Sequence, residues 1–207
     1  MRAVSLPWLS LLLLGAVHGI NPAMGWLFAV ALGMQRRERG AVWRAMLPLA
    51  GGHAAAIAVA ALVVGLAGLA ISLGSLRWIV AAILLGVGVS KLVRTRHPRF
   101  GGMAVGGWQV ATWSFLMASA HGAGLMALPF LLRIERPETT GVLTHVPVAG
   151  VGVALVHTAG YLLVTGIIAV IVYERLGLRL LRRAWFNVDR LWAGALIATA
   201  GLTPFIG

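Results

Sequence analysis

The stretch GAVHGINPAMG, residues 15–25, lies in the middle of a long apolar run. Proline lacks a backbone N–H and clashes with the preceding helical turn. Asparagine is a good N-cap, and proline suits the first helical position after it. We therefore expect the helix to break at Asn21 and to restart at Pro22. In hydrocarbon such a break is tolerated only where protein or a water-filled cavity takes up the released backbone groups. The alternative is an ordinary proline kink.

The composition around this stretch is that of an integral membrane protein. The chain of 207 residues is 60% hydrophobic, its mean hydropathy is +0.93, and several apolar runs exceed the ~20 residues that cross a bilayer. The net charge of +12 is carried by Lys and Arg in short loops, which indicates membrane topology rather than a nucleic-acid interface. The absence of cysteine excludes disulfides and thiolate metal sites.

We expect an all-α integral membrane protein with six transmembrane helices. The expected spans are residues 6–34, 46–71, 76–93, 108–132, 146–173 and 191–205. A cleavable signal peptide over residues 1–19 is an alternative reading of the start, but the apolar run continues past it to Met34, so we expect the segment to be retained.

The loops predict the orientation of the spans. Most of the 17 Lys and Arg lie in alternate loops, within residues 36–44, 91–99 and 175–190. Positive loops stay in the cytoplasm, so both termini are expected outside it. The expected location is the inner membrane of a bacterial cell, with multiple spans.

Four histidines lie inside the apolar spans, and they fall into two matching pairs. The word His18-Gly19 recurs as His121-Gly122, and His53 in the second span corresponds to His157 in the fifth. A histidine in hydrocarbon is costly and is rarely placed there without a role. The recurrence indicates an internal duplication and a shared functional site.

The duplication predicts the domain organisation. Residues 1–93 form a first three-span repeat, residues 94–107 a cytoplasmic linker, and residues 108–207 a second repeat. An odd number of spans forces the second copy to insert upside down relative to the first. Two inverted repeats of this kind are the usual frame of secondary transporters, which bind their solute between the repeats near the middle of the membrane.

The chemistry of imidazole decides what such a site binds. Imidazole is a good ligand for Zn, Ni, Co and Cu, and it also carries protons. No expected span contains Asp or Glu, so any proton coupling has to use imidazole. The expected metal ligands are His18, His53, His121 and His157, and Asn21 and Pro22 complete the expected substrate site. The alternative is that each ring only bonds a backbone carbonyl in helix packing.

Depth within the spans predicts how the four rings are arranged. His18 and His121 fall near mid-span and are expected to approach each other as a central pair. His53 lies toward the cytoplasmic end of its span and His157 toward the outer end, which would separate them by roughly 10 Å at ~1.5 Å of rise per residue. The two remaining histidines, His97 and His145, are expected in loops.

With its Gly-x-x-His-Gly-x-Asn-Pro break over residues 15–22, the chain resembles the lysine-exporter (LysE) superfamily, and within it the nickel/cobalt exporter branch. The resemblance covers nearly the whole chain. It implies two inverted three-helix copies and efflux of a small solute driven by an ion gradient. The positions it carries over are His18, Pro22 and His121, with His53 as a weaker match.

The sequence therefore favours a secondary transporter, an exporter of a transition-metal cation, over an enzyme. An exporter of amino acids or other anionic solutes is the first alternative, because a helix restarting at Pro22 would point its positive end at a carboxylate. A membrane-embedded metalloenzyme would lack a carboxylate base within the spans. A non-transporting assembly subunit is also open. The expected partners are the lipid bilayer and the solute or metal ion, not nucleic acid, and a homo-oligomer is left open.

Overall fold

All regular structure in the described part of the chain is helical, as the sequence predicts. The computed structural model describes residues 2–67, 70–93, 106–134, 142–176 and 188–205. The helices are α1 (Arg2–Ile20), η1 (Pro22–Met24), α2 (Trp26–Arg36), α3 (Arg39–Ala67), α4 (Leu73–Val93), α5 (Gly107–Ala120), α6 (Ala123–Ile134), α7 (Val142–Ile171), η2 (Val172–Leu176), α9 (Val188–Leu202) and η3 (Thr203–Phe205). Most of the predicted linker, residues 94–105, lies outside the described residues.

The helices differ in their capacity to cross a membrane. Two segments, Arg39–Ala67 and Ala149–Arg175, are long and apolar enough to do so, and the bent pair α5–α6 makes a third if it counts as one span. Shorter apolar helices cover Pro7–Ile20, Gly74–Ser90 and Ala193–Phe205. Large apolar side chains such as Leu47, Leu62 and Val93 are more than half exposed on the outside of the helices. An apolar exterior of this kind fits a membrane protein.

The predicted break in the first apolar segment is confirmed. α1 ends at Ile20, and the side chain of Asn21 accepts a hydrogen bond from the backbone N–H of Ala23 at 2.9 Å. Pro22 opens a single 3₁₀ turn rather than an α-helix, and α2 begins only at Trp26. The α-helix does not resume at Pro22 because Gly25 interrupts it, with a φ of 137° that a residue with a side chain rarely adopts.

A second break occurs at the corresponding place in the other half. α5 ends at Ala120, and the turn formed by His121 and Gly122 bends the path to α6 by 63°. Gly122 has a φ of 74°, so this break also depends on a glycine in the left-handed region.

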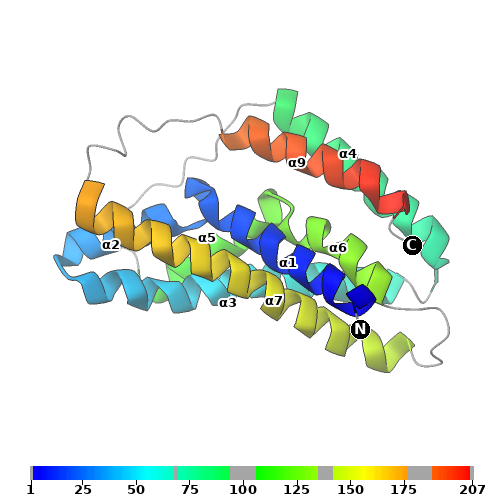
Figure 1. The fold of residues 1–207 in the computed structure, drawn as a ribbon, viewed down its shortest axis with the longest axis horizontal. Coiled ribbons are helices and arrows are strands. Elements are labelled where there is room, and N and C mark those ends of the chain that lie inside the picture. Colours follow the sequence, from blue (N-terminus) through cyan, green and yellow to red (C-terminus); the bar gives the residue numbers. More distant parts are fainter. Residues whose placement is uncertain (1, 68–69, 94–105, 135–141, 177–187, 206–207) are drawn as a thin grey trace.

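The helices pack across the two halves of the chain. α1 packs along α7, and α3 packs along both α5 and α7. Figure 1 shows α1, α3 and α7 running together along the length of the molecule, while α4 and α9 lie beside one another along one flank. Segments far apart in sequence are therefore the closest neighbours.

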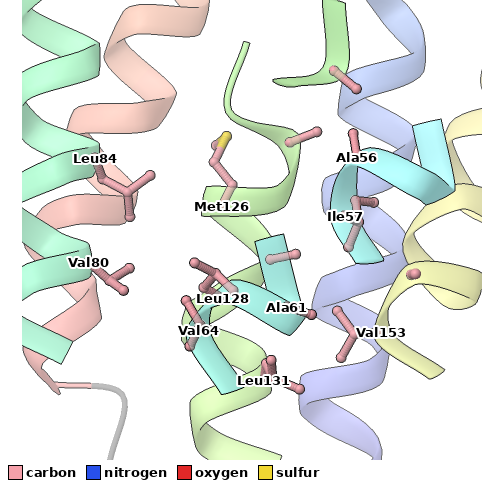
Figure 2. Packing of buried hydrophobic residues seen from close by; sticks show 14 of the residues in the cluster. Ala56, Ile57, Ala61, Val64, Val80, Leu84, Met126, Leu128, Leu131 and Val153 are labelled. Carbon is pink, nitrogen blue, oxygen red and sulfur yellow. The ribbon is translucent and has the colours of Figure 1, made fainter. Parts of the chain in front are cut away.

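The larger core cluster fills the space between α3, α4, α6 and α7. Met126, Leu128 and Leu131 of α6 are at most 2% exposed, and they lie between Leu84 of α4 and Ile57 of α3 (Figure 2). Between membrane helices the stabilisation comes from close van der Waals packing rather than from removal from water, and this packing holds α6 between its neighbours. The bend at residues 121–122 sets the direction in which α6 enters the core.

A buried histidine cluster as the candidate functional site

Three of the four predicted histidines meet in the interior of the molecule. The ring centroids of His18 and His157 are 4.7 Å apart, those of His53 and His157 are 5.4 Å apart, and those of His18 and His53 are 5.8 Å apart. None of the three side chains is more than 1% exposed. They come from α1, α3 and α7, so the cluster joins three separate helices. We call these three residues the histidine cluster.

The cluster forms because α1 and α7 approach one another closely. A Cβ atom on Gly15 would overlap the carbonyl oxygen of His157, and one on Gly19 would lie 2.5 Å from the carbonyl oxygen of Tyr161. Small residues four apart on one helix face permit such an approach in membrane proteins. Gly15 and Gly19 lie on either side of His18 in the sequence. The close approach of α1 and α7 at these two glycines therefore brings the ring of His18 against the ring of His157.

The predicted separation of His53 and His157 is wrong. Their rings are stacked, with an angle of 4° between the planes. Depth had been counted from the ends of the apolar runs. α3, however, begins at Arg39 and α7 at Val142, so both helices extend beyond those runs. Each histidine consequently lies at the middle of its own helix, and the two meet where α3 and α7 pack together.

Tyr161 belongs to the site, although the sequence reasoning missed it. Its ring stacks on the ring of His53, with centroids 4.1 Å apart and an angle of 8° between the planes. Its hydroxyl donates a hydrogen bond of 2.6 Å to the carbonyl oxygen of Met24, in the broken segment. A signal was present, because Tyr161 is one of two tyrosines and lies four residues after His157, on the same helix face.

The released carbonyl groups of the broken segment find donors inside the protein. Trp26 Nε1 donates to the carbonyl of Ile20 at 3.0 Å, and Tyr161 donates to Met24. Thr165 of α7 donates more weakly to Gly19 at 3.4 Å. A buried break needs such partners. Tyr161 and Thr165 therefore tie α7, the helix that carries His157, to the broken segment on either side of Asn21 and Pro22.

His18 and His121 are held in the same way in the two halves. Nδ1 of His18 lies 3.0 Å from the carbonyl oxygen of Leu14, and Nδ1 of His121 lies 2.9 Å from that of Met117, each four residues earlier. A carbonyl only accepts, so Nδ1 carries the proton in both rings and Nε2 carries the lone pair. Backbone carbonyls commonly orient metal-binding histidines through this second nitrogen.

His121 lies at the second break and is 6% exposed. It is close enough to His18 for an electrostatic interaction between the two rings. His18 also contacts the rings of His53 and His157, so it is not paired with His121 alone, contrary to the prediction from the sequence. His145 lies in the first turn of α7 rather than in a loop, and His97 lies outside the described residues.

No protein-family model, characterised protein or solved structure matches this chain. The resemblance to the lysine-exporter superfamily stays a prediction.

The orientation of the rings limits what the cluster binds in this conformation. Within the described ranges, no group of three or more His, Asp or Glu side chains is arranged to hold a metal ion. The reason is geometric, because the lone pairs of a histidine lie in its ring plane. Two stacked rings in parallel planes, such as His53 and His157, cannot aim their lone pairs at one point. An ion would therefore require at least one of these rings to turn.

His53 has unmet bonding capacity inside the cluster. Both of its ring nitrogens are buried, and neither has a hydrogen-bond partner within the described part of the chain. A buried polar group without a partner costs about 1–3 kcal/mol. A cost of this size in a stacked ring is more typical of a functional side chain than of one retained for packing.

Replacing Tyr161 by phenylalanine tests the link between the cluster and the broken segment. Tyr161→Phe keeps the ring stacked on His53 but removes the donor to the buried carbonyl of Met24. We expect the free energy of unfolding to fall by about 1–3 kcal/mol. Chemical or thermal unfolding in detergent measures this loss. Tyr173→Phe, at the other tyrosine, is the control and should change it little; equal stability of the two variants would contradict a structural role for this hydrogen bond.

Proposed function

We propose that the chain is a secondary transporter that exports a transition-metal cation, and that His18, His53 and His157 bind the ion during transport. The observation that carries the proposal is the meeting of three imidazoles from three helices in the buried interior. Imidazole is the common neutral ligand of such ions, and sites made of three histidines hold Zn²⁺ in proteins.

The spacing of the rings supports this proposal. Imidazoles bound to one tetrahedral ion through bonds of about 2.0 Å have ring centroids about 5 Å apart. The three centroids of the histidine cluster are separated by 4.7, 5.4 and 5.8 Å. The backbone therefore already holds the rings at the distance that ligands need. What a bound ion would require is a change in side-chain torsion, not a movement of helices.

The need for that change fits a transporter better than a permanent metal site. A resident ion is held by ligands whose orientation is fixed in advance. In the histidine cluster, His53 lies between the rings of Tyr161 and His157, and binding an ion would open these stacks. Since Tyr161 also bonds to the broken segment, turning of His53 and movement at Met24 would be coupled. Such coupling between site and backbone is what alternating access needs.

The packing pattern supports the duplicated architecture that we propose for this transporter. Each half has a broken helix followed by a long helix of 29 or 30 residues and a shorter one. The broken helix of each half packs on the long helix of the other, α1 on α7 and α5 on α3. Exchange of partners is expected when two copies are related by a two-fold axis, and an odd number of spans in each copy would put that axis in the membrane plane. The proposed location is the inner membrane, with six spans and both termini outside the cytoplasm.

A second function, export of an anionic solute such as an amino acid, is favoured by one separate observation. The side-chain amide nitrogen of Asn21 is buried and has no hydrogen-bond partner within the described residues. It is a donor, and it lies at the break that precedes α2. Donors and helix N-termini at such breaks bind carboxylates in transporters. The amide nitrogen is a donor and cannot bind a cation. The anion function therefore needs donors at the site, whereas the metal function needs lone pairs.

Flux measurements with the purified protein in liposomes separate the two functions. We expect Zn²⁺, Ni²⁺, Co²⁺ or Cu⁺ to cross the membrane faster than in protein-free liposomes, with a pH gradient changing the rate because imidazole binds protons and metal ions competitively. Ca²⁺ and Mg²⁺, which prefer oxygen ligands, are the controls and should not cross. Flux of amino acids without flux of any of the four metals would overturn the metal proposal in favour of the second function.

A further inference from the structure

A small pocket lies at the end of the molecule where α2, α3 and α5 meet, away from the histidine cluster. Its volume is about 110 Å³. A cavity of this volume has room for several water molecules, so a group the size of a phosphate fits into it. Leu32, Val110 and Pro48 contribute apolar wall, and Gly107 also lines the pocket. The residues around the opening decide what kind of group would enter.

Two arginines, Arg36 from α2 and Arg44 from α3, line this pocket. Arg44 forms an ion pair with Glu38, and no ion pair of Arg36 occurs among the described residues. Glu38 is exposed and lies in the short turn between the two helices. Another anion is therefore able to replace Glu38 as the ion-pair partner of Arg44. Two guanidinium groups facing one small pocket are typical of a site for phosphate, because guanidinium binds phosphate oxygens in pairs.

The start of α5 adds to the positive potential of the pocket. α5 begins at Gly107, and its N-cap Gly106 provides no side-chain acceptor for the backbone N–H groups of the first turn. Those groups, with the helix dipole, favour a negative charge at this end. Gly107 has open space where a Cβ would lie, so an anion is able to approach the backbone there. This contribution supports the two arginines; it does not replace them.

The surroundings of the pocket indicate where the phosphate comes from. Leu47 precedes the pocket residue Pro48, and Trp108 follows the pocket residue Gly107. Their side chains are 80% and 82% exposed. Large apolar side chains exposed beside a basic pocket are typical of the membrane interface. The inference rests here on the proposed orientation, in which this end faces the cytoplasmic leaflet, where anionic lipids are found. A free phosphate makes no apolar contact with this rim, whereas the glycerol and acyl part of a phospholipid would pack against it.

We propose that this pocket binds the phosphate headgroup of an anionic phospholipid, with Arg36 and Arg44 as its ligands. Binding joins α2, α3 and α5 at the cytoplasmic end, because the three helices each contribute residues to the pocket. Lipid binding here is independent of what the histidine cluster transports.

The test measures the thermal unfolding of the purified full-length protein in a neutral detergent with added lipid. We expect phosphatidylglycerol to raise the midpoint by roughly 5–10 °C when its concentration is about 100 times the Kd. Phosphatidylcholine with the same acyl chains should give little change. Arg36→Gln and Arg44→Gln should each weaken binding of phosphatidylglycerol about fivefold. Glu38→Gln should strengthen it, because the competing carboxylate is removed, and this variant keeps the test informative if an arginine variant folds poorly.

Arg37→Gln is the matched control, since Arg37 is the next residue after Arg36 but does not line the pocket. An equal loss of binding in Arg37→Gln and Arg36→Gln would overturn the proposal in favour of general attraction to a basic loop. An equal shift with phosphatidylcholine would overturn it too. Inorganic phosphate and glycerol 3-phosphate form the soluble arm. If they reproduce the shift at matched concentration, and the same arginines are needed, the site binds a free anion and the lipid assignment is wrong.

Discussion

Replacing Gly52 by alanine is expected to destabilise the protein by about 3 kcal/mol or more, whereas the same change at the adjacent Gly51 is expected to be harmless. A Cβ atom on Gly52 would overlap the carbonyl oxygen of Ala111 on α5 and would lie 2.8 Å from the backbone nitrogen of Phe115. Backbone atoms cannot move aside as a flexible side chain can, so α3 and α5 would have to separate. A Cβ on Gly51 would meet nothing within 4 Å.

The contact between α3 and α5 also includes a polar bond that separation would break. Ser114 Oγ donates a buried hydrogen bond of 2.7 Å to the carbonyl of Leu49. The measurement is unfolding of both variants in detergent, followed by size-exclusion chromatography to detect loss of the folded monodisperse form. Gly51→Ala should equal the wild type or exceed it slightly, because alanine is the better helix former. Equal stability of the two variants would show that the helices do not pack at this distance.

Replacing His53 by phenylalanine is expected to reduce transport by about 100-fold or more while leaving the free energy of unfolding unchanged or raised by about 1 kcal/mol. Phenylalanine keeps an aromatic ring between Tyr161 and His157, so the stacks survive. It removes both ring nitrogens, which are buried without a partner in the described part of the chain. If His53 serves packing alone, the variant should transport as well as the wild type.

Because transport is expected to fall while the free energy of unfolding is kept or raised, the His53→Phe variant separates a role in function from a role in folding. Loss of a residue that only packs lowers stability, and transport falls with it. Loss of a ligand lowers transport while stability is kept. His97→Phe is the control, because it removes a histidine that lies outside the predicted spans. Flux of the chosen metal in liposomes and unfolding in detergent, measured on the same preparations, give both quantities. Normal transport by His53→Phe would remove His53 from the site, whatever the fate of the other two histidines.

The helix break and the burial of the histidines could be predicted from the sequence because both depend on local chemistry. Asn21 caps a turn and Pro22 cannot continue a helix wherever they occur, so these two residues determine where α1 ends. The apolar runs around His18, His53, His121 and His157 have to be buried or covered by lipid, and the four side chains are between 0% and 6% exposed. These inferences need no knowledge of which helices are neighbours.

The pairing of the histidines was decided only by the tertiary structure. His53 and His157 stack because α3 and α7 extend beyond their apolar runs, which residue counting from the ends of those runs cannot detect. Tyr161 enters the site because α7 closes on α1 at Gly15 and Gly19, an approach set by both helices together. Local patterns specify where a chain bends and which residues avoid water. Which buried rings touch depends on the crossing of helices that are more than 100 residues apart in sequence, and this is a property of the packed molecule.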